Sequence, residues 1–270
     1  MRLSLLAAIL AVMAVTDANA ETLRLYAAGS LKAAMTDVAR AFEAATDEAH
    51  KVEIHFGPSG LMRQRIEKGE PAHVFASANM KHPQALLDAH KAQGSVRMFA
   101  RNRLCAIVQQ TIEVTTESLL DRLLDDGIRV GTSTPKADPS GDYAFALFAK
   151  ADALKAGARK RLEDKALKLT GGADTEKAPE GRNQYAWVMT EDRADIFLTY
   201  CTNAVLAQKD SRALQIVAIP PELAVGADYG LIILEGAPAS AADLVRFILS
   251  PPAQAILQSY GFGKGDDAVP

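Results

Sequence analysis

The sequence has little of several features that would narrow its function at once. Among its 270 residues are only two cysteines, and the formal net charge is −3. Near-neutral charge without a basic run argues against a nucleic-acid partner, because binding to the phosphate backbone needs a basic surface. Beyond the N-terminal region, no apolar run approaches the ~20 residues that a membrane-spanning helix needs. We therefore expect neither a nucleic-acid-binding protein nor a membrane-spanning one.

The signatures of common catalytic and metal-binding sites are also missing. There is no Gly-x-Ser-x-Gly elbow of an α/β-hydrolase and no glycine-rich phosphate loop. Ser133-Thr-Pro-Lys136 has the Ser-x-x-Lys spacing of penicillin-recognising enzymes. Its proline opposes the helix that this motif needs, and the companion motifs are absent. The five histidines show no i, i+4 pairing. We therefore expect a binding protein without a resident cofactor or histidine metal site, and not an enzyme.

The two cysteines, Cys105 and Cys201, leave two interpretations open. In an oxidising compartment they form one disulfide or remain two buried thiols. The sequence does not give the distance between them, so neither interpretation is preferred.

The start of the chain is typical of an exported protein. Residues 1–20 combine a basic start, an apolar stretch and an Ala18-Asn-Ala20 exit, which is the pattern of a secretory signal peptide. No cysteine follows the apolar stretch, so no lipid attachment is expected. We expect cleavage after Ala20 and an unanchored chain in a Gram-negative periplasm.

Strand and helix patterns alternate along the rest of the chain. The predicted strands are 23–27, 51–56, 73–78, 103–109, 128–131, 195–200, 214–219 and 228–234. The predicted helices are 31–42, 61–69, 80–91, 116–124, 143–154, 182–190, 239–249 and 252–260. This alternation predicts an α/β fold with mostly parallel sheets.

Two turns of the same kind follow the first two predicted strands. Ser30 follows Gly29, and Ser59 lies within Gly57-Pro-Ser-Gly60, each at a place where a helix N-cap is expected. Such helix starts favour anions, because their backbone N–H groups and dipole carry positive partial charge. Ser140 and Arg182 stand near two further helix starts. In an open α/β sheet these starts gather where the strands end.

Several motifs taken in order carry a resemblance to a known family. They are Ala28-Gly-Ser-Leu31, Gly57-Pro-Ser-Gly60, Pro71-Ala-His-Val-Phe-Ala-Ser-Ala78, Pro139-Ser-Gly-Asp-Tyr143, Asp195-Ile-Phe-Leu-Thr-Tyr200 and the end from Phe247 to Phe262. Together they resemble the periplasmic molybdate-binding proteins of ABC importers, over essentially all of the chain after residue 20.

This resemblance implies a periplasmic binding protein type II fold, in which two α/β lobes enclose a ligand cleft. One lobe would take residues 21–102 and 218–270, and the other residues 103–217. The implied function is to capture molybdate or tungstate and to deliver it to an inner-membrane ABC permease, as a monomer.

The resemblance also assigns site residues. Ser30, Ser59 and Tyr200 match the hydroxyl donors that hold the oxyanion. Ser140 matches a position that donates its backbone N–H. These are neutral donors fixed in place, which suits a tetrahedral anion that offers only acceptors.

The segment around Arg182 and Asn183 departs from the family. One of these residues falls where the family offers a backbone N–H from a small or apolar residue. An arginine there could supply a two-pronged donor for a different, possibly organic, anion. It could equally point to solvent with only its backbone engaged, and the sequence leaves both interpretations open.

Overall fold

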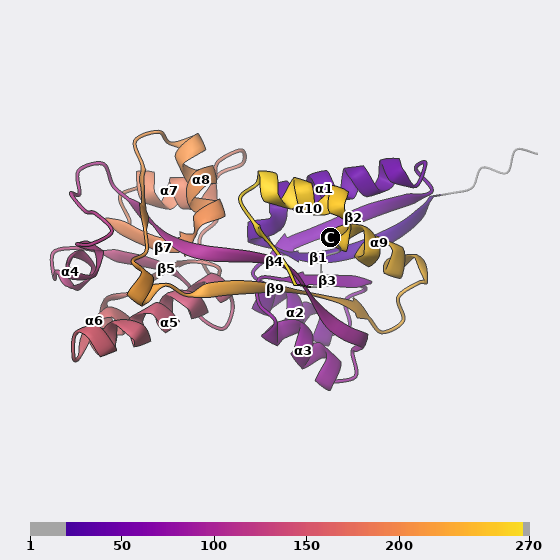
Figure 1. Ribbon diagram of the computed structural model, residues 1–270, viewed down its shortest axis with the longest axis horizontal. Coiled ribbons are helices and arrows are strands. Elements are labelled where there is room, and N and C mark those ends of the chain that lie inside the picture. Colours follow the sequence, from indigo (N-terminus) through magenta and orange to yellow (C-terminus); the bar gives the residue numbers. More distant parts are fainter. Residues whose placement is uncertain (1–19, 267–270) are drawn as a thin grey trace, which may run out of the picture.

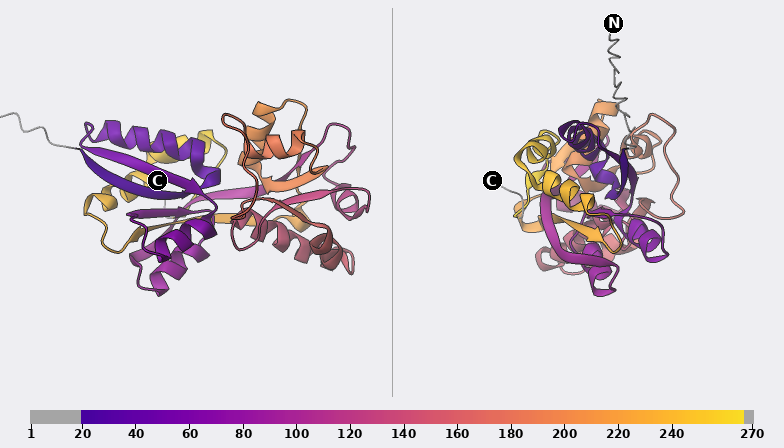
Figure 2. Two further views of the ribbon diagram at one scale, coloured as in Figure 1. Left: turned by 180° about the vertical axis from the view of Figure 1, so that it is seen from behind. Right: turned by 90° about the vertical axis from the view of Figure 1, so that its right-hand side faces the viewer.

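The chain folds into two α/β lobes joined by two long strands. The computed structural model describes residues 20–266, so the predicted signal peptide lies outside the described residues except for Ala20. The two connecting strands are β4 (Ala92–Val108) and β9 (Gly226–Leu234), which run between the lobes in Figure 1 and in the left view of Figure 2. No helix within residues 20–266 combines the length and apolarity needed to cross a membrane.

The first lobe is built on three parallel strands. β1 (Glu21–Ala28) lies between β2 (His50–Gly57) and β3 (Val74–Ser77) and is parallel to both. From its third residue onward β1 is buried except at Arg24, as expected for a strand that is covered on both faces. The helices of this lobe are η1 (Gly29–Leu31), α1 (Lys32–Ala45), α2 (Ser59–Glu67), α3 (Lys81–Asp88), α9 (Ser240–Leu249) and α10 (Pro251–Ser259).

The second lobe has its own parallel strands. β5 (Val130–Ser133) pairs in parallel with β6 (Leu167–Thr170) and β7 (Ile196–Tyr200). Its helices are α4 (Leu119–Leu124), α5 (Pro139–Leu154), α6 (Ala158–Lys165), α7 (Gln184–Thr190) and α8 (Cys201–Asp210). The remaining short elements are β8 (Gln215–Ala218), η2 (Pro221–Leu223) and β10 (Gly263–Lys264).

One continuous sheet runs through both lobes, in the order β2-β1-β3-β9-β4-β7-β5-β6. Its centre is antiparallel, because β9 pairs antiparallel with β3 and β4, and β4 pairs antiparallel with β7. The prediction of mostly parallel strands was therefore right for the flanks and wrong for the centre. The centre differs because β4 and β9 pass between the lobes in opposite directions.

The strand β4 changes partner where it leaves the first lobe. Its pairing with β9 extends to Arg103, opposite Gly226, and its pairing with β7 begins at Leu104, opposite Tyr200. The change of partner lies one residue after the predicted lobe boundary between residues 102 and 103, which stays a prediction.

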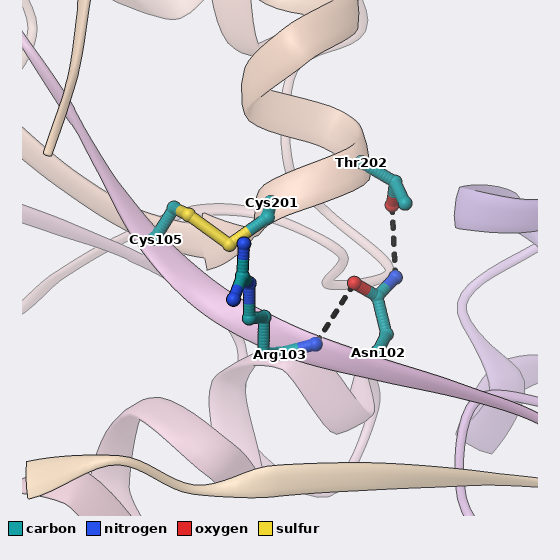
Figure 3. The surroundings of a disulfide bond; sticks show 5 residues. All are labelled: Asn102, Arg103, Cys105, Cys201 and Thr202. Carbon is teal, nitrogen blue, oxygen red and sulfur yellow. Dashed lines mark hydrogen bonds between the residues drawn. A yellow bond between two sulfur atoms is a disulfide. The ribbon is translucent and has the colours of Figure 1, made fainter. Parts of the chain in front are cut away.

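Cys105 and Cys201 form a disulfide, which decides between the two interpretations left open by the sequence. The bond ties β4 to the first residue of α8 (Figure 3). Beside it, Asn102 Nδ2 donates to Thr202 Oγ1 at 2.8 Å. The crossing strand therefore holds the start of α8, directly after Tyr200, by a covalent bond and a hydrogen bond.

Candidate functional site

The first lobe places the two predicted serine turns side by side. β1 and β2 run in parallel with Ala28 opposite Gly57, so the turns that follow the two strands lie together. η1 begins after Ala28 and α2 begins after Pro58, and neither start has a side-chain cap. Backbone N–H groups at these starts are therefore not used by capping side chains.

Ser30 and Ser59 are not the N-caps that the sequence predicted. Ser30 lies inside the short helix η1, and its Oγ forms a hydrogen bond of 2.9 Å with the Tyr229 hydroxyl. Ser59 is the first residue of α2, and its Oγ accepts the Ala78 N–H at 3.0 Å. Because the Ser59 oxygen is the acceptor in that bond, its own proton can still be donated to an anion.

Tyr200 comes from the second lobe and ends β7. Its side chain is 1% exposed, and its hydroxyl donates to the Ala78 carbonyl at 3.4 Å. Burial raises the pKa of Tyr200 well above its usual value, so the phenol stays protonated and remains a donor. Ser59 and Tyr200 therefore meet at Ala78 from opposite lobes.

A cleft with a volume of about 1070 Å³ lies between the lobes. Of the predicted site residues, those that line it are Ser30, Ser59, Arg182, Asn183 and Tyr200. Ser140 is not among the lining residues. The volume slightly exceeds the ~300–1,000 Å³ that is usual for small-molecule pockets, so a single tetrahedral anion would not fill the cleft.

At the start of α5 the predicted backbone donor is already occupied. Ser140 is fully buried, and its N–H donates to Asp138 Oδ1 at 3.0 Å. Asp138 is the N-cap of α5 and itself lines the cleft. Burial raises the pKa of Asp138 to about 6, against the lowering effect of its hydrogen bonds. A carboxylate thus stands where the resemblance implies a free N–H.

The start of α7 is capped in the same way. Asn183 Oδ1 accepts the N–H groups of Tyr185 and Ala186, both at 3.0 Å. The backbone N–H of Asn183 donates to Asp210 at 3.3 Å. The backbone N–H of Asn183 is therefore not free for an anion.

Arg182 reaches the cleft, but its guanidinium already has partners. Its Nε lies 3.1 Å from Asp210 Oδ2, and its Nη2 donates to Thr190 Oγ1 at 3.3 Å. The side chain remains partly exposed in this arrangement. Asp210 therefore balances the positive charge of Arg182, which the sequence had suggested as a donor for a different anion.

The lobes also touch through their backbones. The N–H of Gly60 in α2 donates to the carbonyl of Ala137, just before α5, at 2.8 Å. A Cβ on Gly60 would lie 2.2 Å from the Lys136 carbonyl oxygen, so only glycine allows this approach. The described structure is therefore an arrangement in which the two lobes are in direct contact.

Most lining residues were not predicted as site residues, among them Asp138, Tyr185 and Asn203. Asp138 is the N-cap of α5, and the Tyr185 ring packs edge-on against Phe197. Asn203 lies in α8, where the sequence has no clear amphipathic pattern, and its Nδ2 donates to Thr199 Oγ1 at 3.1 Å. Of these three, only Asp138 had a local signal, the Asp-Pro pair typical of an N-cap followed by the first helical residue.

The cleft lining thus combines hydroxyl and N–H donors with charged side chains of both signs, among them the Asp138 carboxylate. Within residues 20–266, no group of three or more His, Cys, Asp or Glu side chains could hold a metal ion. The chemistry available includes binding of an anion through neutral donors, beside the lining cations Lys32, Arg65 and Lys177.

Comparison with known proteins agrees with this architecture. The family model for bacterial extracellular solute-binding proteins matches residues 23–263. An uncharacterised protein of Pasteurella multocida is 38% identical over 77% of this chain and 86% of its own length. The molybdate-binding protein ModA of Escherichia coli is 25% identical over 88% of this chain and 87% of its own.

Solved structures share the two-lobe fold. The periplasmic binding protein AfuA from Actinobacillus pleuropneumoniae, with fructose-6-phosphate bound, has a TM-score of 0.69 at 14% identity, covering 93% of this chain and 87% of its own. Such a likeness shows the fold alone. The family model, which matches residues 23–263, shows that this chain belongs to the bacterial extracellular solute-binding protein family.

Proposed function

We propose that this chain captures a small oxyanion in the cleft between its lobes, in the periplasm, and delivers it to an inner-membrane ABC permease. One observation carries the proposal: Ser59 and Tyr200 come from opposite lobes and meet at Ala78, beside two helix starts without side-chain caps. Hydroxyl and N–H donors suit an anion that offers only acceptors. Each charge-assisted bond contributes about 1.5–3 kcal/mol.

The two-lobe arrangement also gives a reason for ligand-dependent closure. Ser30 and Ser59 belong to one lobe and Tyr200 to the other, so each lobe alone offers only part of the donor set. A ligand that contacts both lobes stabilises the closed state over the open one. A permease can then distinguish loaded from empty protein by shape.

Molybdate and tungstate are the candidate ligands that the sequence motifs favour. Their support is the order of motifs in the sequence and the name of the E. coli relative, which is similar over most of both chains. The mature protein would be titrated calorimetrically with molybdate, tungstate, sulfate and phosphate. We expect binding of at least one of them, and no heat with any of the four would argue against the proposal.

A serine pair supplies the matched variants for this titration. Ser59→Ala removes a donor of the cleft and should weaken binding about tenfold or more. Ser259→Ala removes an exposed hydroxyl that bonds to the Ile256 carbonyl within α10 and does not line the cleft, so it should leave affinity unchanged. Equal affinities for the two variants would remove Ser59 from the site.

A phosphorylated organic anion is the second candidate. It is favoured by the cleft volume of about 1070 Å³, which exceeds what a single tetrahedral oxyanion fills. Fructose-6-phosphate, named with the AfuA structure, is a suitable probe. Because Arg182 is paired with Asp210, this candidate does not depend on a free arginine charge. Tighter binding of fructose 6-phosphate than of all four inorganic anions would favour it.

A further inference from the structure

A carboxylate lies inside the cleft that we propose to hold an anion. Asp138 lines the cleft, and its Oδ1 is held by the Ser140 N–H at 3.0 Å. On the other side it is packed against the turn after β6, since a Cβ on Gly171 would lie 2.5 Å from both Cβ and Oδ2 of Asp138. The side chain is therefore fixed between α5 and this turn.

Asp138 also lies next to the anion donors of the other lobe. The residue before it, Ala137, accepts the N–H of Gly60, which is the residue after Ser59. When the lobes are in contact, the carboxylate is thus brought to the start of α2. An anion held by Ser59 would be close to Asp138.

The groups around Asp138 do not neutralise it. Among residues 20–266, the charge that acts on it is that of another carboxylate, Asp142 on the same helix, and not that of a cation. The Ser133 hydroxyl of β5 bonds to it. Three phenols are also near Asp138: those of Tyr185 on α7, Tyr200 on β7 and Tyr229 on β9. Burial raises the pKa of each phenol, and the negative charge of Asp138 raises it further.

A carboxylate offers only acceptors. Sulfate, molybdate and tungstate carry no proton at neutral pH, so they would place a like charge against Asp138 without a hydrogen bond between them. Hydrogen phosphate carries a P–OH group, and a sugar phosphate carries hydroxyls. Either can donate to the carboxylate while its other oxygens accept from the first lobe.

We infer that Asp138 sets the ligand class of this cleft, which accepts anions that carry their own hydrogen-bond donor and discriminates against fully deprotonated ones. The inference rests on the proposed function, because it selects among the oxyanions that the cleft would capture. It ranks inorganic phosphate and hydroxylated phosphate esters above sulfate and molybdate.

The test compares ligands of matched charge in matched variants at pH 8. Wild type, Asp138→Asn and Glu180→Gln are titrated with inorganic phosphate, sulfate, molybdate and fructose 6-phosphate. At this pH phosphate is mostly the hydrogen phosphate dianion, which has the charge of sulfate and nearly its size. Asparagine keeps the shape and the N-cap function of Asp138, so the variant should fold, and a melting curve checks this. Glu180 is an exposed carboxylate at the same cleft.

In wild type, phosphate or fructose 6-phosphate should bind at least about tenfold more tightly than sulfate and molybdate, the effect of one charge-assisted hydrogen bond. In Asp138→Asn, the affinities for the donor-bearing anions and for sulfate and molybdate should differ by less than about threefold. Glu180→Gln should keep the wild-type ratio of affinities.

The inference alone is wrong if wild type binds sulfate or molybdate as tightly as the donor-bearing anions, or if Asp138→Asn keeps the preference. No binding of any of the four probes by wild type refutes the proposed function and the inference with it.

Discussion

Gly60 is the residue at which the contact between the lobes can be tested most directly. Its N–H donates to the Ala137 carbonyl of the opposite lobe at 2.8 Å. A methyl group in Gly60→Ala would lie 2.2 Å from the Lys136 carbonyl oxygen and 2.8 Å from that of Ala137. Both are backbone atoms, which cannot move aside like a flexible side chain. The lobes of this variant must therefore separate.

The size of the effect follows from this overlap. Forcing an extra methyl group into a packed contact costs about 1–3 kcal/mol. If the closed state alone bears this cost, the affinity for a ligand that bridges the lobes falls roughly 5- to 150-fold, at about 1.4 kcal/mol for each factor of ten. The free energy of unfolding should change by less than about 1 kcal/mol, because an open protein avoids the overlap and alanine favours the helix over glycine.

Two measurements check this prediction. Small-angle X-ray scattering should give a larger radius of gyration for Gly60→Ala than for wild type. Calorimetric titration with an anion that wild type binds should show the loss of affinity. Gly226→Ala is the control, since a Cβ there meets no atom within 4 Å. An unchanged radius and affinity in Gly60→Ala would show that this contact is not part of the closed state.

Three further predictions concern stability and the site. Reducing the Cys105–Cys201 bond, which closes a loop of sequence separation 96, should lower the unfolding free energy by about 2–5 kcal/mol in denaturant titrations, and an unchanged midpoint would contradict this. Burial lowers the pKa of His82 to about 4, below its value of about 6.5 in the unfolded chain. Stability should therefore fall by up to about 3 kcal/mol as pH drops from 6.5 to 4, and His82→Leu should remove that part of the slope in pH-dependent melts. Arg182→Ala should change anion affinity less than about threefold, because Asp210 already holds the guanidinium. A loss above tenfold in titration would return Arg182 to the binding site.

Local patterns in the sequence were sufficient to predict most of the fold. The helix α1 could be predicted because Met35, Val38 and Phe42 are buried at three- and four-residue spacing. The helix α6 was missed because its sequence is almost entirely charged, with only Ala158 and Leu162 buried. The first part of β4 was missed as well, because it is exposed and irregular where it pairs with β9.

The candidate site was only partly predictable, for a physical reason. Strand–turn–helix order places Ser30, Ser59 and Tyr200 at strand ends, and the cleft includes all three. The partners of each hydroxyl depend on residues far away in the chain, such as Tyr229 for Ser30. The sequence could not indicate that Asp138 would face an anion donor from the opposite lobe.

The helix starts of the two lobes differ in a way that suggests a division of roles. In the first lobe the residues before η1 and α2 are Ala28 and Pro58, which leave backbone N–H groups without side-chain caps. In the second lobe Asp138 and Asn183 cap α5 and α7 with their own side chains. The start of α8, after Tyr200, also lacks a side-chain cap. Two uncapped starts lie side by side on the first lobe, at η1 and α2, and there we expect the anion to bind first.

Closure then brings a carboxylate, not a further set of N–H donors, against the bound anion. The Gly60–Ala137 contact, formed when the lobes meet, places Asp138 near the start of α2. A ligand with a donor gains a hydrogen bond from this movement, whereas a ligand without one meets repulsion between like charges. Ligand selection and lobe closure are thus the same step. We therefore expect anions without a donor to bind the first lobe weakly and to leave the protein open.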